Sequence, residues 1–136
     1  MADFVQKSDR NEEAVESLNK FSFYDQAVHC SYYACLQYIM FFNIEKGIDE
    51  TSLKHAVRES KQKGQGTNVA YISLMLKYIK RIDQRLFKNL TRDVGKLKTL
   101  RTDADYSERM LSISESEEAF RLAKNIKSDL KEIIKI

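Results

Sequence analysis

The stretch from Ser22 to Gly47 constrains the fold more than any other part of the chain. Its apolar and small residues recur at steps of three and four, which is the spacing of one face of an α-helix. These residues are Tyr24, Ala27, Val28, Ser31, Tyr32, Cys35, Tyr38, Ile39 and Phe42. Further apolar residues between positions 34 and 44 widen this face almost to a full circle. A helix that is apolar on nearly all sides is covered by other helices, so we expect a buried central helix.

The composition favours helices along the rest of the chain as well. The 136 residues include no proline and only 4 glycines, and both of these residue types interrupt helices. A chain of this length forms one domain, residues 1–136, and buries most of its apolar residues in one core. We therefore predict an all-α fold, an antiparallel bundle of four to five helices joined by short connections.

Capping residues and apolar periodicity place the predicted helices. Ser8, Ser22 and either Ser112 or Ser114 are the predicted N-caps, and Gly47 is the predicted left-handed end of the central helix. The predicted helices span residues 9–20, 22–47, 49 or 51–60, 69–103 and 112–134, with a break or kink in the fourth near residue 80. The last of them carries an apolar stripe. Segment 61–68 is polar, basic and contains two glycines, so it is predicted to be a loop.

Charge is distributed unevenly along the chain. Residues 1–50 include 4 basic and 9 acidic residues, whereas residues 51–101 include 13 basic and 3 acidic residues. This asymmetry favours an anionic partner for the middle segment. Six basic residues there fall on one side of a helical wheel: Lys77, Arg81, Arg85, Lys88, Arg92 and Lys96. Such a stripe either follows the phosphates of a nucleic acid or is simply a solvated helix face.

Arg101 departs from this stripe and falls next to the apolar arc of the same predicted helix. A guanidinium aimed at a packed flank needs a partner, because its charge is costly to bury alone. Asp105, four residues later, can supply one within the helix. Arg101 is therefore either a residue with a special role or half of a structural ion pair.

His29 shares a flank of the central helix with Asp25 and Tyr33, at four-residue steps. This flank is either a polar seam at a helix or subunit interface or the wall of a ligand cleft. The sequence has 2 histidines and no CxxC or HExxH spacing, so we expect no metal and no cofactor. It has no run of 18 apolar residues and no apolar signal core at its start, so we expect a cytoplasmic protein without a membrane segment.

Two segments carry a recognisable pair of motifs. The segment AVHCSYYACLQYIMFFNIEKG, Ala27 to Gly47, contains YYA, and LRTDADYSE, Leu100 to Glu108, contains LRxxADY, about 67 residues further on. In this arrangement the chain resembles the HEPN superfamily (higher eukaryotes and prokaryotes nucleotide-binding), nearest its small stand-alone bacterial and archaeal members. The similarity runs from about Val15 to Ile134. It implies a bundle of four to five helices that forms a homodimer with a cleft at the interface.

The resemblance also implies a set of functions. Many HEPN proteins are metal-independent ribonucleases, in which an arginine and a histidine four to six residues later converge at the cleft. Others are toxins neutralised by a nucleotidyltransferase partner, or non-catalytic binding modules. Arg101 matches the family arginine, but no histidine follows it, and Tyr106 stands at the fifth position after it. Tyrosine, with a pKa near ~10, is a poor base at neutral pH, so binding is expected in preference to efficient cleavage.

We therefore expect Arg101, Asp105 and Tyr106 to line a site that binds RNA or a nucleotide, or that docks a nucleotidyltransferase partner. His29, Tyr33 and Asp25 are candidate helpers, provided that the fold brings them to this site. The stripe from Lys77 to Lys96 would add electrostatic affinity. Two alternatives stay open. One is a metal-independent ribonuclease toxin of a toxin–antitoxin or defence system that uses Arg101 with Tyr106 or His29, and the other is a structural dimerising bundle.

Overall fold

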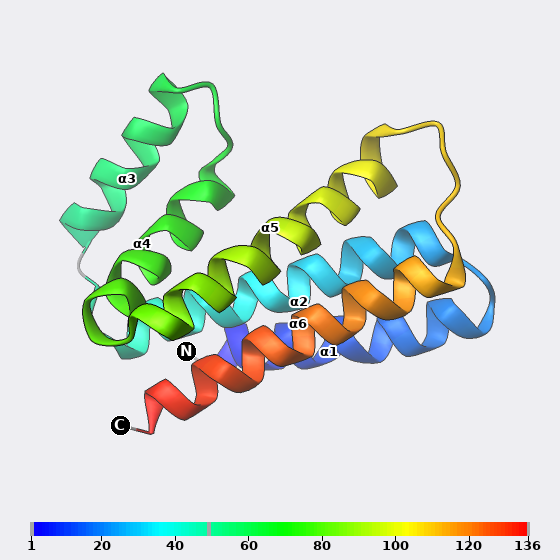
Figure 1. Cartoon of the computed structure of the whole chain (residues 1–136), viewed down its shortest axis with the longest axis horizontal. Coiled ribbons are helices and arrows are strands. Elements are labelled where there is room, and N and C mark those ends of the chain that lie inside the picture. The colour runs from blue at the N-terminus through cyan, green and yellow to red at the C-terminus, as the bar shows by residue number, and fades with distance from the viewer. Residues whose placement is uncertain (1, 49, 136) are drawn as a thin grey trace.

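The computed structural model describes residues 2–48 and 50–135, and these residues form six α-helices and no strand (Figure 1). The helices are α1 (Ala2–Lys20), α2 (Tyr24–Glu45), α3 (Glu50–Gln62), α4 (Thr67–Ile82), α5 (Gln84–Tyr106) and α6 (Ile113–Ile134). The prediction of an all-α helical bundle is confirmed. Six helices are present because the region predicted as one helix over 69–103 is divided at Asp83.

Helix α2 lies at the centre of the bundle and contacts α1, α4, α5 and α6. Its buried residues are Ala27, Val28, Ser31, Tyr32, Ala34, Cys35, Leu36, Tyr38, Ile39, Phe42 and Asn43. They occupy a little more than half of the helix circumference, and the contacts with four other helices confirm the expectation of a central helix. The other side of α2, which carries His29, Tyr33 and Gln37, is half-buried, so these residues can meet solvent.

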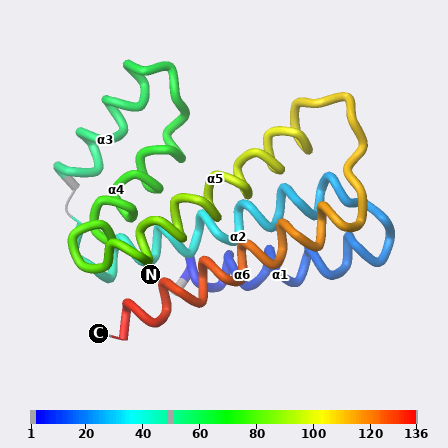
Figure 2. Tube along the Cα trace, viewed as in Figure 1, coloured from blue at the N-terminus to red at the C-terminus, as the bar shows by residue number. Residues whose placement is uncertain are grey.

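The long helices and the α3–α4 hairpin occupy different parts of the molecule. Helices α1, α2, α5 and α6 run roughly along the long axis, and the hairpin projects from one end (Figure 1). Among the described helices α3 packs on α4 alone. The Cα trace shows the α1–α2 turn and the α5–α6 connection together at the opposite end (Figure 2). A hydrogen bond of 2.6 Å from Ser116 Oγ to Asn19 Oδ1 ties α6 to α1 there.

Two of the predicted N-caps are wrong. Ser8 lies inside α1, which begins at Ala2, and its hydroxyl is buried and donates a hydrogen bond of 2.7 Å to the carbonyl oxygen of Ala34. Ser22 has a φ of 64°, in the left-handed region, and α2 begins only at Tyr24. Ser22 belongs to the tight turn after α1, so the Ser22 side chain does not cap α2.

Two other predicted helix ends, at Gly47 and Ser112, are confirmed. Gly47 has a φ of 72° just after α2, a conformation that glycine adopts without strain. Ser112 caps α6 in a reciprocal capping box with Glu115. Asp83 separates α4 from α5, and its side chain accepts a hydrogen bond of 3.0 Å from the Leu86 backbone N–H. Of the two caps predicted for the third helix, Asp49 lies outside the described residues, and Thr51 is inside α3.

Candidate functional site

Arg101 and Asp105 lie one turn apart in the last part of α5, so their side chains meet on one face of the helix. Arg101 Nε is 3.0 Å from Asp105 Oδ2, and each side chain is 19% exposed. The predicted pairing of these two residues is confirmed. Nε is buried and makes no aligned hydrogen bond to any described residue, so the contact is an ion pair without a directional bond.

Three tyrosine rings surround the guanidinium of Arg101. Its Cζ lies 5.2 Å from the ring centre of Tyr32, 5.6 Å from that of Tyr106 and 5.9 Å from that of Tyr33. Ring faces at this range attract a cation. Nη2 also donates a long hydrogen bond of 3.4 Å to the Tyr33 hydroxyl. The guanidinium is thus held largely by aromatic rings, and these contacts leave most of its N–H donors unused.

These surroundings keep Arg101 charged. Burial acts to lower its pKa, but Tyr33, Asp105 and Tyr106 outweigh that effect and raise the pKa above the ordinary arginine value. Burial also raises the pKa of Tyr32, although the nearby charge of Arg101 opposes this. The site therefore presents a permanent cation next to the Tyr32 phenol, whose raised pKa favours its neutral form.

His29 reaches the same carboxylate from α2. Its Nδ1 lies 3.0 Å from Asp105 Oδ2 and 3.1 Å from Oδ1, and its ring centre is 4.7 Å from that of Tyr33. The imidazole is 46% exposed, so it meets solvent beside the half-buried guanidinium of Arg101. From the sequence, His29 and Tyr33 could join Arg101 only if the fold brought them there, and the structure brings all of them to one site.

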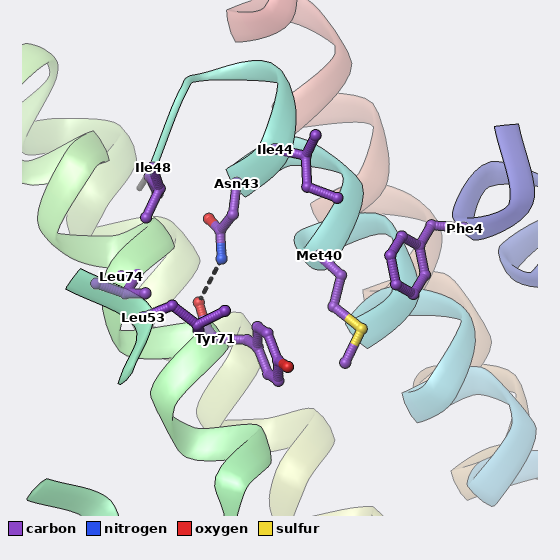
Figure 3. Close-up of a pocket in the computed structure, with 8 residues that line it drawn as sticks. All are labelled: Phe4, Met40, Asn43, Ile44, Ile48, Leu53, Tyr71 and Leu74. Atoms are coloured by element: carbon purple, nitrogen blue, oxygen red, sulfur yellow. Dashed lines mark hydrogen bonds between the residues drawn. The ribbon is translucent and has the colours of Figure 1, made fainter. Parts of the chain in front are cut away.

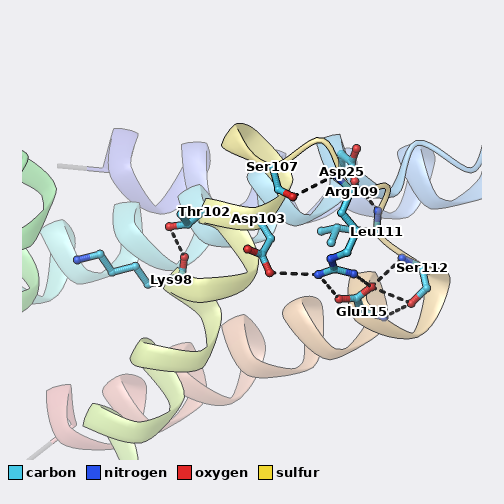
Figure 4. A network of polar contacts seen from close by, with 9 residues as sticks. All are labelled: Asp25, Lys98, Thr102, Asp103, Ser107, Arg109, Leu111, Ser112 and Glu115. Carbon is cyan, nitrogen blue, oxygen red and sulfur yellow. Dashed lines mark hydrogen bonds and ion pairs between the residues drawn. The ribbon is translucent and has the colours of Figure 1, made fainter.

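Asp25 stands at the edge of this site and has a structural contact. Its Oδ1 accepts a hydrogen bond of 3.0 Å from the backbone N–H of Leu111 (Figure 4). This bond fastens the α5–α6 connection to the first turn of α2. Asp25, His29 and Asp105 line one open concavity of about 580 Å³. Tyr106 ends α5 nearby with 74% of its surface exposed. The residues predicted from the sequence as the site and its helpers therefore lie at or around one hollow.

Arg109, in the α5–α6 connection, is a residue that sequence reasoning missed. It donates two hydrogen bonds of 2.8 Å to the carboxylate of Glu115 and one of 3.1 Å to Asp103 (Figure 4). The bonds from Arg109, with one from the Ser112 backbone N–H, lower the pKa of Glu115 to about 2. Arg109 thereby fixes the segment that follows Tyr106. An arginine in a connection has no periodic pattern, so the sequence offered no signal for this role.

Lys127 is the second missed residue. It is 5% exposed on α6, and its Nζ donates to Asp9 at 2.7 Å, to Glu12 at 2.8 Å and to Ser8 at 3.1 Å. Here the sequence did contain a signal, because Lys127 falls within the apolar stripe predicted for the last helix. A lysine in that position needs anionic partners from another helix.

The predicted basic stripe is divided between two helices. Lys77 and Arg81 lie on α4, and Arg85, Lys88, Arg92 and Lys96 lie on α5. The backbone between them is extended at Asp83 (φ −156°, ψ 100°), so the break predicted near residue 80 is confirmed, and the stripe runs over two helices. All six side chains are exposed, and Arg92 Nε lies 3.2 Å from the carboxylate of its neighbour Asp93. A role for these residues in binding nucleic acid stays a prediction.

Comparison of the chain with models of protein families, with curated proteins and with solved structures found no match in any of the three. Within residues 2–48 and 50–135, no group of three or more His, Cys, Asp or Glu side chains is arranged to hold a metal ion. No helix in the described part of the chain is both long and apolar enough to cross a lipid bilayer. The chemistry of the site follows from its own geometry.

Proposed function

We propose that this chain is an HEPN-type module of the cytoplasm that forms a homodimer and binds the phosphate of RNA or of a nucleotide at Arg101. The observation that carries the proposal is the meeting of Arg101, Asp105 and His29 beside an open concavity. A guanidinium presents its N–H donors as a planar fork that matches phosphate oxygens. The resemblance of segment 100–108 to the family motif points to the same arginine.

The groups around Arg101 suit a nucleic-acid ligand. The exposed ring of Tyr106 can stack on an unpaired base. Asp105 is engaged by Arg101 on one side and His29 on the other, so it repels a phosphate less than a free carboxylate would. The exposed basic residues of α4 and α5 add a long-range attraction that weakens as salt rises.

A second function, metal-independent cleavage of RNA, is favoured by the contact of His29 with Asp105. When Nδ1 donates its proton to the carboxylate, the lone pair of the ring is on Nε2, as in catalytic histidines that a carboxylate orients. Nε2 would take the proton of the ribose 2′-hydroxyl while the 2′-oxygen forms a bond to phosphorus. The bond from phosphorus to the 5′-oxygen breaks, that oxygen takes a proton from water, and the hydroxide left behind takes the proton held on Nε2, so the imidazole is neutral again and a 2′,3′-cyclic phosphate remains.

Binding and cleavage of labelled single-stranded RNA by the purified chain, with EDTA present, separate the two functions. We expect Arg101→Ala to weaken binding about tenfold or more, because a charge-assisted hydrogen bond contributes about 1.5–3 kcal/mol. The matched control is Arg121→Ala, which removes an arginine on α6 that is 56% exposed and paired with Glu118. Its effect should stay within about twofold, the size expected for one distant surface charge.

Each result supports or contradicts one function. Binding without cleavage that is lost in Arg101→Ala supports the binding module, and cleavage lost in both Arg101→Ala and His29→Ala supports the ribonuclease. If Arg101→Ala binds and cleaves RNA as well as the wild type does, or if the wild type neither binds nor cleaves RNA, both functions are contradicted and a structural bundle remains. Sedimentation at micromolar concentration tests the homodimer, and a monomer there contradicts it.

A further inference from the structure

A second pocket lies at the other end of α2 from His29 and Arg101. It has a volume of about 250 Å³ and opens between the C-terminal end of α2, the start of α1 and the α3–α4 hairpin (Figure 3). Its lining residues are Phe4, Met40, Asn43, Ile44, Ile48, Leu53, Tyr71 and Leu74. None of these described lining residues carries a carboxylate, ammonium or guanidinium group. Because α2 rises about 1.5 Å per residue, the fourteen residues from His29 to Asn43 place this pocket about 20 Å from the Arg101 site.

Asn43 is the polar residue that gives this pocket its chemistry. It is 6% exposed, and its Nδ2 donates a hydrogen bond of 3.1 Å to the carbonyl oxygen of Tyr71. Its Oδ1 is buried and accepts no hydrogen bond from any described residue. In Figure 3 this oxygen points away from Tyr71, toward the side of the pocket where Ile48 and Leu74 lie. Buried carbonyl oxygens are almost always paired, so Oδ1 marks a position for a donor that no described residue supplies.

We propose that this pocket binds an uncharged, mostly apolar small molecule that carries one hydrogen-bond donor, and that the donor pairs with Asn43 Oδ1. The apolar walls disfavour a charged ligand, because no group among the described lining residues would neutralise it. An apolar cavity of about 150 Å³ holds benzene, so the larger volume here suits a molecule with two fused rings. The ligand is a small molecule and not a peptide helix, because three separate elements enclose the space.

The position of α3 gives a ligand a way in. Helix α3 packs on α4 alone among the described helices, and it supplies Leu53 to the pocket wall. A small movement of α3 relative to α2 therefore opens the pocket while the core around α2 stays packed. The same movement would bring Asn43 Oδ1, which has almost no exposed surface, within reach of the donor.

Indole and 1-methylindole test this proposal, because they share a ring system and differ in the N–H donor. The chain contains no tryptophan, so a change in indole fluorescence on titration comes from the ligand alone. We expect indole to bind the whole chain about fivefold more tightly than 1-methylindole, the factor that one net hydrogen bond gives. Asn43→Leu keeps the size of the side chain and removes Oδ1, so the two probes should bind this variant equally.

A filled pocket and a matched control complete the test. Leu53→Phe replaces a lining leucine with a larger aromatic side chain, which should fill the pocket and abolish binding of both probes. Lys54→Phe adds the same ring to the exposed side of α3 and should leave binding unchanged. The comparison of Leu53→Phe with the wild type decides the matter even if Asn43→Leu fails to fold.

Three results would overturn the proposal. The first is that neither probe binds the wild type at concentrations up to millimolar, which would mean that an ordered water alone satisfies Oδ1. The second is equal binding of the two probes by the wild type. The third is a Leu53→Phe variant that binds no less tightly than Lys54→Phe. A dimer that Leu53→Phe dissociates, with no probe binding to the wild type, assigns the pocket to a second copy of the chain.

Discussion

Lys127 and Arg101 are both cations packed against α2, but the protein satisfies them to different degrees. The ammonium of Lys127 has three N–H donors, and these meet Asp9, Glu12 and Ser8 at 2.7 to 3.1 Å. The ring centre of Tyr38 lies 5.3 Å away. Every donor of this cation is therefore used inside the protein, at a position that is 5% exposed.

Arg101 has five N–H donors, and the structure uses few of them. The Tyr33 hydroxyl accepts one at 3.4 Å, and Asp105 lies close to Nε without an aligned bond. Rings attract a cation through their faces and do not require a donor. The difference teaches that Lys127 joins α6 to α1, whereas Arg101 is held in place with most of its N–H donors unpaired by described residues.

The largest effect is expected for Lys127→Met, which keeps the apolar stem and removes the charge. Asp9 and Glu12 lose their partner, and the free energy of unfolding should fall by about 2–3 kcal/mol in urea denaturation. Lys124→Met, an exposed lysine of the same helix, should change it by about 0.5 kcal/mol or less. RNA binding should be unchanged, and a Lys127→Met variant as stable as the wild type contradicts the structural role.

The pH dependence of Lys127 gives the same comparison another test. Burial acts to lower its pKa, but the hydrogen bonds to Asp9 and Glu12 outweigh this and raise it above the ordinary value of 10.5. The stability that the charged Lys127 contributes with Asp9 and Glu12 is therefore complete below pH 10.5. It is lost as the pH rises through the higher pKa of Lys127 in the folded protein. The wild type should lose part of its advantage over Lys127→Met in alkaline urea denaturation, and parallel curves would exclude the linkage.

A smaller effect is expected for Arg101→Lys, and it falls on binding. Lysine keeps the charge but loses the planar fork, so RNA affinity should fall about tenfold, while the free energy of unfolding changes by less than about 1 kcal/mol. Filter binding at several salt concentrations measures the RNA affinity, and urea denaturation measures the free energy of unfolding. If the loss appears in stability and RNA affinity is unchanged, Arg101 belongs in the same structural class as Lys127.

The sequence predicted those structural features that are set by residues close together in the chain. The buried faces of α2, the capping box of Ser112 and the pairing of Arg101 with Asp105 all arise from residues three or four positions apart. The contact of His29 with Asp105 joins residues 76 positions apart, so only the packing of α5 against α2 could show it. Ser22 misled for a related reason, because the turn between two packed helices sets its backbone and overrides its preference to cap.

A weaker effect is expected for Tyr33→Phe, which tests how far the tyrosines position Arg101. The variant keeps the ring and removes the hydroxyl that accepts a long hydrogen bond from Nη2. RNA affinity and the free energy of unfolding should each change by no more than about 0.5 kcal/mol, the low end for a hydrogen bond. A tenfold loss of affinity would show that the hydroxyl, and not the ring, presents the guanidinium to the ligand.

The smallest effect is expected for Glu115→Gln, which asks whether a fully paired cation is structural even at the surface. Arg109 is paired with Glu115 and Asp103, but its side chain is 50% exposed, so solvent screens the interaction. Hydrogen bonds from Arg109 lower the pKa of Glu115 from 4.5 to about 2. The stability that the ionised Glu115 contributes is therefore present above pH 4.5 and is lost as the pH falls toward 2. In urea denaturation at pH 6, 4 and 3 the free energy of unfolding of the wild type should approach that of Glu115→Gln as the pH falls. The control is Glu117→Gln, which changes an exposed residue of the same helix, and its free energy of unfolding should change with pH in parallel with that of the wild type. A loss at pH 6 as large as that of Lys127→Met would mean that paired donors, and not burial, make a cation structural in this fold.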